Sequence, residues 1–249
     1  IEIDAVPFPP RGAWAPAGLS PSIRPGSLVA LTGPSGAGKT TMTQVLLGLL
    51  PPDRGRVRIV PDGGDPGSAV DLSQIDPATW WEQIAWVPQR PTITPGTVLD
   101  NVLDHAEPGA AAAEDVPNVL VEAARATGFD EVVDGLPQGW RTPVGTAGVG
   151  LSVGQRQRLA LTRALCSTAP LVVMDEPTAH LDAASEAHVL DGVEMLRSQH
   201  RTVVVIAHRA ALVSMADDVI DVTSRPAREP GNCPHDLPTV PGAGEGTAR

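Results

Sequence analysis

The 249-residue sequence predicts an α/β fold with a mainly parallel sheet, a small N-terminal antiparallel β-layer and an inserted α-helical subdomain. Short apolar runs alternate with helical patterns in both halves of the chain, which is typical of a parallel sheet. A glycine-rich loop joins the first of these runs to a helix at residues 33–40. Residues 97–134 carry helical patterns with little strand propensity, which indicates a helical insertion.

These patterns divide the chain into parts. We expect one domain over residues 1–222, with a core of residues 1–89 and 167–222 and a helical subdomain at about 90–166. Residues 223–249 are rich in proline and glycine, and we expect a disordered C-terminal tail there.

Composition excludes several classes of protein. A net charge of −11 argues against a nucleic-acid partner, because nucleic-acid-binding domains carry a basic face. Cys166 and Cys233 lie far apart without metal-ligand spacing, which indicates a reduced, cytosolic protein with neither disulfide nor zinc. No apolar run reaches the roughly 20 residues of a membrane helix, and no signal peptide opens the chain. Because the chain does not begin with Met, we expect it to be a piece of a longer polypeptide.

The first 31 residues predict two strands. Ile1–Val6 alternates apolar and polar residues, as an exposed antiparallel strand does. The stretch that follows is rich in proline and glycine and contains the aromatic residues Phe8 and Trp14. A turn at Arg24–Gly26 then leads into Ser27–Leu31, which predicts a buried strand.

The next residues have the pattern of a phosphate-binding loop, G-x-x-x-x-G-K-[ST]. With the threonine that follows, they are Gly33, Pro34, Ser35, Gly36, Ala37, Gly38, Lys39, Thr40 and Thr41. The glycines let backbone N–H groups approach an anion, and the predicted helix at Met42–Leu50 adds the positive end of its dipole. Lys39, the only lysine in the chain, would reach the β- and γ-phosphates of a nucleotide, and Thr40 would hold Mg²⁺.

A nucleotide base needs an aromatic platform on which to stack. Trp14 and Phe8 both lie upstream of the phosphate loop, which makes them the two candidates. We assign the role to Trp14 ahead of Phe8. Either side chain could instead be a hydrophobic plug in the small β-layer.

Two further strands are predicted at Gly55–Val60 and Gln83–Pro88, with a loop and a short helix at Asp71–Trp81 between them. Gln89 stands at the end of the second strand, where a parallel sheet presents side chains to its ligand. We predict Gln89 in the catalytic centre and among the Mg²⁺ ligands. A solvated loop glutamine is the alternative.

The middle of the chain predicts helices at Thr97–His105, Asn118–Ala126 and Glu131–Asp134, and a flexible segment at Thr142–Gly150. A longer helix is predicted at Val153–Cys166.

The start of that longer helix is a second candidate phosphate contact. Ser152 is a natural N-cap, Gly154 permits close backbone approach, and Gln155 follows. This pattern alone is a weak signal. It becomes a strong one about 120 residues after a phosphate loop.

Leu171–Asp175 predicts a buried parallel strand that ends on a carboxylate, and Glu176 follows directly. Adjacent carboxylates at the tip of an apolar strand are costly unless they are paired or used. Asp175 would bind Mg²⁺ through water, and Glu176 would act as general base toward an attacking water. A helix is predicted after them at Ala184–Arg197.

Thr202–Ala207 predicts another buried strand, with His208 at its tip. A histidine in this place can donate a hydrogen bond to a γ-phosphate oxygen and help to orient the water. The last predicted strand is Val219–Val222.

In this order the motifs resemble the ATP-binding domain of ABC transporters across nearly all of residues 1–222. They are the phosphate loop, Gln89, the signature Leu151–Gln155, the strand that ends at Glu176, the loop Leu181–Asp182 and His208. The resemblance implies ATP and Mg²⁺ as cofactors, ATP hydrolysis, and a dimer with a second ABC ATP-binding domain. In that dimer Ser152, Gly154 and Gln155 would contact ATP on the partner's phosphate loop, and Asp182 would lie at the dimer seam.

Residues 89–91 and 95–102 resemble exporters whose membrane domain precedes the ATPase in one chain. This implies a transmembrane domain fused N-terminally and a location at the cytoplasmic face of the plasma membrane. Thr142–Gln155, with LSVGQ in place of the commoner LSGGQ, resembles the CydD type. CydD and CydC form heterodimeric thiol exporters, for cysteine or glutathione, that support cytochrome bd assembly.

The sequence departs from the family pattern at three points. Val153 replaces a signature glycine, although Ser152 and Gly154 remain. Thr146 stands where exporters often carry a glutamate that senses the membrane domain. The chain has no tyrosine for the usual stacking on adenine.

Two functions follow as hypotheses. The first is an ATPase that powers export through membrane helices outside this chain. The second is an ATP-binding but catalytically weak, regulatory half of a heterodimeric exporter of drugs, lipids or peptides. A DNA-repair or chromosome ATPase would need a coiled-coil insertion between Gln89 and Leu151 and a basic face, and the sequence has neither.

Overall fold

The structure, a computed structural model, describes residues 1–4, 13–14, 21–52, 55–61, 66–103, 116–145, 150–179 and 181–226. Phe8, Thr146 and Cys233 lie outside these ranges, as does the remainder of the predicted tail from residue 227. For Trp14 the structure describes the backbone and not the side chain.

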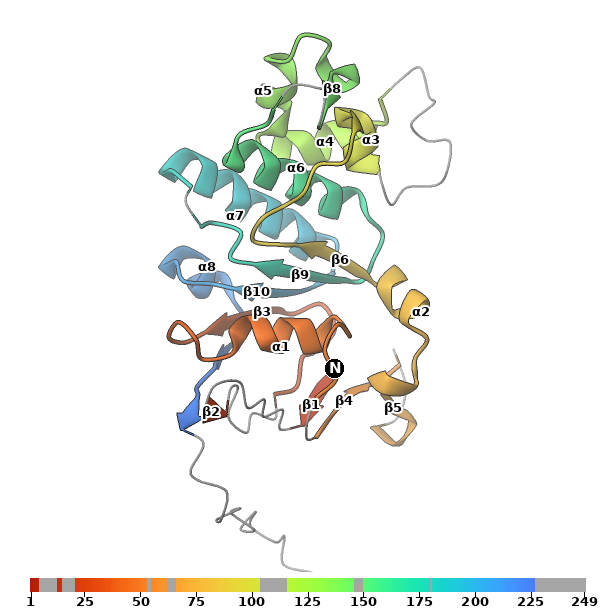
Figure 1. Cartoon of the computed structure of the whole chain (residues 1–249), viewed down its shortest axis with the longest axis vertical. Coiled ribbons are helices and arrows are strands. Elements are labelled where there is room, and N and C mark those ends of the chain that lie inside the picture. The colour runs from red at the N-terminus through yellow and green to blue at the C-terminus, as the bar shows by residue number, and fades with distance from the viewer. Residues whose placement is uncertain are drawn as a thin grey trace, which may run out of the picture.

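A five-stranded parallel sheet forms the centre of the molecule (Figure 1). In spatial order its strands are β11 (Asp218–Asp221), β3 (Leu28–Thr32), β10 (Thr202–Ile206), β9 (Leu171–Asp175) and β6 (Ile84–Val87). Every neighbouring pair is parallel, which confirms the predicted sheet. The order is not that of the sequence, so the connections cross over the faces of the sheet, as parallel strands require.

Helices cover both faces of this sheet. Helix α1 (Lys39–Leu46) lies on one side, and helices α6 (Val153–Cys166) and α7 (Ala183–Ser198) lie on the other (Figure 1). Side chains alternate along each strand, so Val173 and Val204 pack toward α1 while Val172 and Val203 pack toward α6 and α7. Both faces are therefore buried, which explains why the sequence shows continuous apolar runs in these strands.

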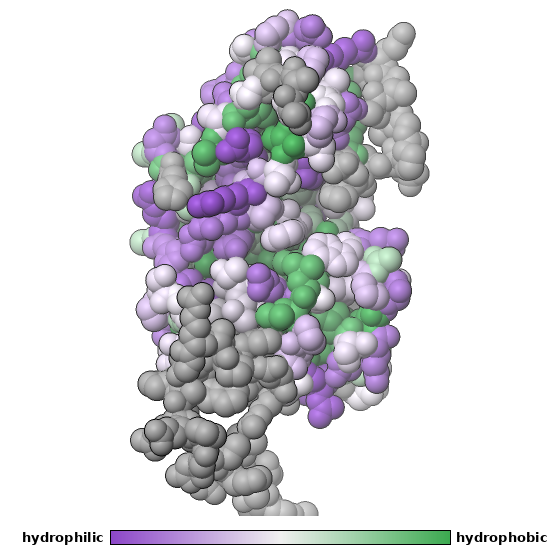
Figure 2. All heavy atoms as spheres, viewed as in Figure 1, coloured by the Kyte–Doolittle hydropathy of each residue, from purple (hydrophilic) through white to green (hydrophobic). Residues whose placement is uncertain are grey.

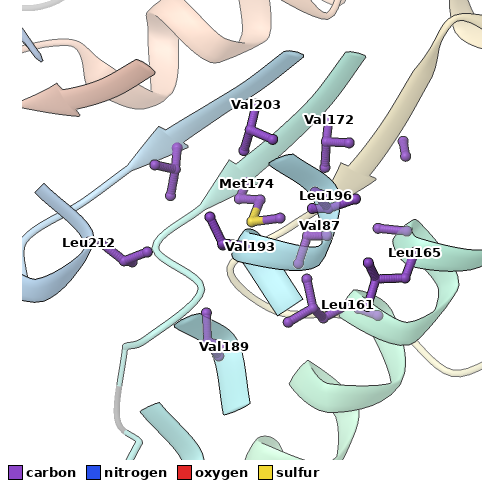
Figure 3. Packing of buried hydrophobic residues seen from close by; sticks show 14 of the residues in the cluster. Val87, Leu161, Leu165, Val172, Met174, Val189, Val193, Leu196, Val203 and Leu212 are labelled. Atoms are coloured by element: carbon purple, nitrogen blue, oxygen red, sulfur yellow. The ribbon is translucent and has the colours of Figure 1, made fainter. Parts of the chain in front are cut away.

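The core between the sheet and α6–α7 is closely packed (Figure 3). Met174 of β9 meets Val193 and Leu196 of α7, and Leu161 of α6 lies beside them. On the face of the molecule shown in Figure 2, the described surface is mostly hydrophilic and its hydrophobic residues form separate areas. This distribution is expected when most large apolar side chains are used in the core.

A small antiparallel sheet lies beside the core, as predicted. Its strands are β1 (Glu2–Asp4), β4 (Arg56–Ile59) and β5 (Val70–Asp71), in that order. Short 3₁₀ turns at Pro66–Ser68 and Leu72–Gln74 flank β5, and helix α2 (Pro77–Glu82) follows. The indole nitrogen of Trp80 in α2 donates to the carbonyl of Leu46 at a distance of 3.0 Å, which fastens α2 to the end of α1.

The helical insertion is confirmed, with α6 as its base. Its other helices are α3 (Val98–Leu103), α4 (Asn118–Ala126) and α5 (Phe129–Asp134), with a 3₁₀ turn at Gly139–Arg141. Phe129 is completely buried among apolar side chains of α3, α4 and Leu159 of α6. Two-residue strands β7 (Gly96–Thr97) and β8 (Pro143–Val144) pair antiparallel within this part.

Three sequence predictions were wrong in part. Helix α1 ends at Leu46 rather than Leu50, because Gly48 adopts a left-handed conformation that terminates the helix. The segment predicted to be flexible begins instead with the buried Thr142 and strand β8. The predicted disordered tail begins too early, because β12 (Arg225–Pro226) pairs antiparallel with β2 (Ala13–Trp14).

Helix α8 (Ala210–Met215) was not predicted. In the described part of the chain, none of the helices combines the length and apolar character that a membrane span requires.

Close packing of α7 on α6 yields a stability prediction. A Cβ atom added at Gly192 would lie 2.8 Å from the Cδ2 atom of Leu161, so Gly192→Val overpacks this contact. We expect a loss of about 1–3 kcal/mol, or several degrees in Tm, measured by thermal unfolding. Ala187→Val on the exposed side of the same helix is the control, with an expected loss of about 0.7 kcal/mol at most. Equal effects of the two substitutions would contradict the prediction.

Candidate functional site

The phosphate loop lies between the C-terminal end of β3 and the first turn of α1, as predicted. Gly33 and Gly38 have φ angles of 128° and 101°, which favour glycine. A side chain at Gly33 would be impossible without movement, because its Cβ would lie 2.2 Å from the carbonyl oxygen of Val222. The loop therefore exposes backbone in a shape that only this glycine pattern permits.

The start of α1 suits an anion. It has no side-chain cap and no acidic residue in its first turn, so its N–H groups and dipole remain available. The Lys39 side chain is only 6% exposed, and its ammonium donates to the carbonyls of Gly33 and Pro34 at 2.8 and 2.9 Å. These features fit the phosphates of a nucleotide.

Asp175 ends β9 near this loop. Burial raises the pKa of its carboxyl, the neighbouring Glu176 raises it further, and Lys39 acts in the opposite direction. The carboxylate is thus partly stripped of water and needs a cationic partner. Thr40 is exposed at the start of α1, and Thr41 follows it.

A metal site assembled from many side chains is not found here. Within the described ranges, no group of three or more His, Cys, Asp or Glu side chains could hold a metal ion. Mg²⁺ differs in keeping several waters and binding through one or two protein groups plus substrate phosphates. The hydroxyl of Thr40, the carboxylate of Asp175 and the amide of Gln89 are oxygen donors that fit this mode.

Glu176 is the centre of a three-residue cluster. The Nε2 atom of Gln89 donates to its Oε2 atom at 2.8 Å, and the Nε2 atom of His208 lies 3.1 Å from its Oε1 atom. The three residues follow β6, β9 and β10, which are neighbours in the sheet. The structure therefore brings together all three residues that the sequence predicts to be catalytic.

The backbone of Glu176 is strained. Its φ angle is +48°, in the left-handed region that non-glycine residues rarely adopt. Such strain is held in place only by the surrounding structure and is concentrated at functional sites. Beside the carboxylate lies a hollow of about 80 Å³, lined by Thr178, Ala179, His208 and Arg209. It has room for ordered water.

The signature residues form a separate site. The Ser152 hydroxyl accepts from the N–H of Gln155 at 3.2 Å, and the Gln155 side chain accepts from the N–H of Ser152 at 2.8 Å. This capping box confirms Ser152 as the N-cap of α6. No hydrogen bond among the described residues joins these two signature residues to the phosphate loop.

Some residues of the site were missed from the sequence. Arg209 lines the hollow beside Glu176 and forms an ion pair with Glu186 at 3.3 Å. Its position directly after His208 was the available signal. The stacking role of Trp14 remains a prediction, because its side chain is outside the described structure.

The parallel sheet, the phosphate loop and the carboxylates at the strand ends define a P-loop nucleoside triphosphatase. A family model described as ABC transporter matches residues 17–179. The chain is 38% identical over 231 residues to the mycobactin import ATP-binding/permease protein IrtB of Mycolicibacterium thermoresistibile, a match that covers 93% of this chain. It is 38% identical over 204 residues, or 82% of this chain, to the colicin V secretion/processing ATP-binding protein CvaB of Escherichia coli.

A solved structure of a bacterial Atm1-family ABC exporter with ATP bound is also similar, with a TM-score of 0.71 and 29% identity over 91% of this chain. The chain spans 37%, 27% and 38% of the lengths of IrtB, CvaB and the Atm1-family exporter. The chain belongs to the ABC transporter family, of which it is an ATPase domain.

The partly buried carboxylate of Asp175 yields a prediction for stability. A raised pKa in the folded state means that the ionised group opposes folding, so Asp175→Asn should stabilise the nucleotide-free chain at pH 7. We expect a gain of up to about 1 kcal/mol, or about 2–4 °C in Tm. The gain should vanish as the pH falls below the ordinary pKa of aspartate, where Asp175 is protonated in both states.

Thermal unfolding from pH 3 to pH 8 measures this effect. Asp191→Asn, on an exposed position of α7, is the matched control and should change Tm little. Destabilisation by Asp175→Asn at pH 7 would contradict the prediction.

Proposed function

We propose that this chain is the ATP-hydrolysing domain of an ABC exporter, in which MgATP-driven dimer closure powers transport through membrane helices outside the chain. The observation that carries the proposal is the cluster at Glu176, which Gln89 and His208 hold by both carboxylate oxygens. A nucleotide-binding protein without hydrolysis has no need of a strained carboxylate held in this way.

Glu176 is the proposed general base. Its carboxylate faces a hollow large enough for water, and it follows the strand that ends beside Lys39 and the phosphate loop. It would accept a proton from a water that attacks the γ-phosphorus of ATP. Gln89 and His208 would fix its orientation, and His208 would also donate to a γ-phosphate oxygen.

The phosphates are the proposed ligand of the loop from Gly33 to Thr41. Backbone N–H groups and the ammonium of Lys39 would bind them, and the carbonyls that Lys39 now contacts would be exchanged for phosphate oxygens. Thr40, Asp175 and Gln89 would hold Mg²⁺, which neutralises charge on the β- and γ-phosphate oxygens when it is bound.

A second ABC ATP-binding domain is the proposed partner. Ser152, Gly154 and Gln155 lie at the start of α6, where they are at least partly exposed and make no bond to the chain's own phosphate loop. They would complete the ATP site of the partner, either a copy of this chain or a different one. ATP closes the dimer because it binds the closed state more tightly. We also propose that the ATP-binding domain consists of a core and a helical subdomain at about residues 90–166.

Substitution of Glu176 tests the proposed chemistry. We expect Glu176→Gln to reduce ATP turnover by about 10²–10⁴-fold, because the amide cannot accept the proton. ATP binding should persist, because the phosphate loop is unchanged. Phosphate release measures turnover, and equilibrium dialysis measures binding. Glu122→Gln, an exposed position of α4, is the control and should leave both quantities unchanged. Hydrolysis at the normal rate by Glu176→Gln would refute the assignment.

The proposal for the transported substrate rests on one short sequence segment. The pattern of residues 142–155 favours thiol export, of cysteine or glutathione for cytochrome bd assembly, by a heterodimer with an N-terminally fused membrane domain. The relatives compared above are named for mycobactin import and for colicin V secretion. ATP-dependent uptake of labelled cysteine and glutathione into inverted membrane vesicles, by the chain joined to its membrane domain, tests this proposal. The proposed location is the cytoplasmic face of the plasma membrane.

The second candidate function is a catalytically weak regulatory half of a heterodimeric exporter of drugs, lipids or peptides. The presence of valine at position 153 of the signature favours it. Val153 is the first residue of α6, its side chain is 51% exposed, and it lies between Ser152 and Gly154. Its methyl groups stand at the helix end that would meet the partner's ATP. A bulky apolar side chain there would weaken the contact by displacing water without replacing its hydrogen bonds.

Val153→Gly distinguishes the two candidates. We expect it to change turnover by no more than about three-fold, because Ser152 and Gly154 already supply the contacts. A rise of ten-fold or more would favour the weak regulatory subunit instead. The matched control is Val119→Gly, which removes an equally exposed valine near the start of α4.

A further inference from the structure

Arg158 and Ser185 join two helices at a point that the proposed chemistry does not use. The Nη2 atom of Arg158 in α6 donates to the Oγ atom of Ser185 in α7 at 2.8 Å. Its Nη1 atom donates to the carbonyl of Gly128 at 3.0 Å and lies 3.7 Å from a carboxylate oxygen of Glu131. The Arg158 side chain is 17% exposed, and Ser185 is buried. A shielded hydrogen bond from a charged group is strong and directional.

On the α7 side, this contact leads directly to the loop Leu181–Asp182. The N–H of Ser185 donates to the carboxylate of Asp182 at 2.8 Å, which makes Asp182 the N-cap of α7. The bonds from Ser185, with a smaller contribution from Arg158, keep the pKa of Asp182 below its ordinary value. Ser185 thus receives a bond from Arg158 at its hydroxyl, and both its backbone N–H and its hydroxyl interact with the carboxylate of Asp182.

On the α6 side, the contact lies close to the signature Leu151–Gln155. Arg158 follows Gln155 by three residues and is therefore less than one helical turn away. At the start of the helix, Gly154 lies near the other loop, because a Cβ atom added there would lie 3.5 Å from the Cδ2 atom of Leu181. The two loops are thus close together and are joined below by Arg158 and Ser185.

We propose that the hydrogen bond between Arg158 and Ser185 is a latch that holds the signature Leu151–Gln155 and the loop Leu181–Asp182 as one rigid unit. Arg158 and Ser185 are then positioning residues for closure of the dimer, a role that rests on the function proposed above. Both loops must meet the partner at once, and a unit that is rigid beforehand loses less entropy on association.

Amide hydrogen exchange of the nucleotide-free chain tests the latch without any partner. Ser185→Ala keeps the backbone cap to Asp182 but removes the hydroxyl, which is the acceptor for Arg158 and also interacts with Asp182. Arg158→Lys leaves Ser185 intact and keeps the charge while losing the planar fork. We expect exchange at residues 152–156 and 182–186 to be about ten-fold faster in both variants. Exchange in β3 and β10 should not change, which separates a loosened latch from general destabilisation.

Ser198→Ala on the same helix is the matched control, because Ser198 is exposed and its hydroxyl donates to the carbonyl of Met195 within α7. It should leave exchange at both loops unchanged. Unaltered exchange at residues 152–156 in Ser185→Ala would overturn the latch.

A second measurement tests the consequence for closure. With Glu176→Gln present to prevent hydrolysis, sedimentation in MgATP gives the dissociation constant of the dimer. We expect Ser185→Ala to weaken the dimer about ten-fold while the affinity of the monomer for ATP stays the same. If the variant dimerises as tightly as its parent, the latch has no role in closure. If the parent itself does not dimerise, the partner is a different chain, and hydrogen exchange alone decides the latch.

Discussion

Parallel pairing of β3, β10 and β9 is the constraint on which the site depends. Ile206 of β10 stands opposite both Leu31 and Asp175, so the three strands end at one level. The residues that follow the strands are therefore neighbours in space: the phosphate loop after β3, Glu176 after β9 and His208 after β10. A slip of two residues in one pair would keep the apolar face buried and yet move a catalytic group by more than 6 Å. The apolar alternation and the backbone ladder both repeat every two residues, so neither excludes such a slip by itself. The fit of the particular side chains packed on each face must also fix the register.

The site itself opposes folding. Asp175 is a carboxyl group in partly dehydrated surroundings, and Glu176 holds a left-handed backbone. Within the described residues, the buried ammonium of Lys39 donates to backbone carbonyls rather than to a carboxylate. Each of these costs free energy in the absence of nucleotide. Two apolar clusters offset this cost, one on each face of the sheet. Nucleotide phosphates would offset the charge of Lys39, and Mg²⁺ would offset that of Asp175, which links ligand affinity to the stability of the empty site.

The sequence predicted elements well where the local pattern determines them. The strands before Gly33, Glu176 and His208 are apolar runs buried on both faces, and the Ser152 cap follows from local chemistry. Features that depend on remote pairing were not predicted. The sequence predicted Gln89 in the catalytic centre but not its bond to Glu176, which exists because β6 pairs with β9. The pairing of β12 with β2 joins residues more than 200 positions apart, which no local pattern can indicate.

Helix α6 connects the sheet to the helical part, and arginine side chains fix it in place. Leu159 packs among α3–α5, whereas other residues of the same helix pack on the sheet. The Nη1 atom of the buried Arg201 donates to the carbonyl of Ala164, and the Nε atom of Arg163 in α6 donates to that of Asn101 in α3, both at 2.7 Å. Asn101 in turn bonds to Thr94, a few residues after Gln89. In the proposed transporter, these bonds would couple a displacement of Thr94 to α3 and, through Arg163, to α6. The signature stands at the capped end of the same continuous helix, so it would move with α6 as a unit. Charge-assisted hydrogen bonds suit this coupling because they are stronger than neutral ones.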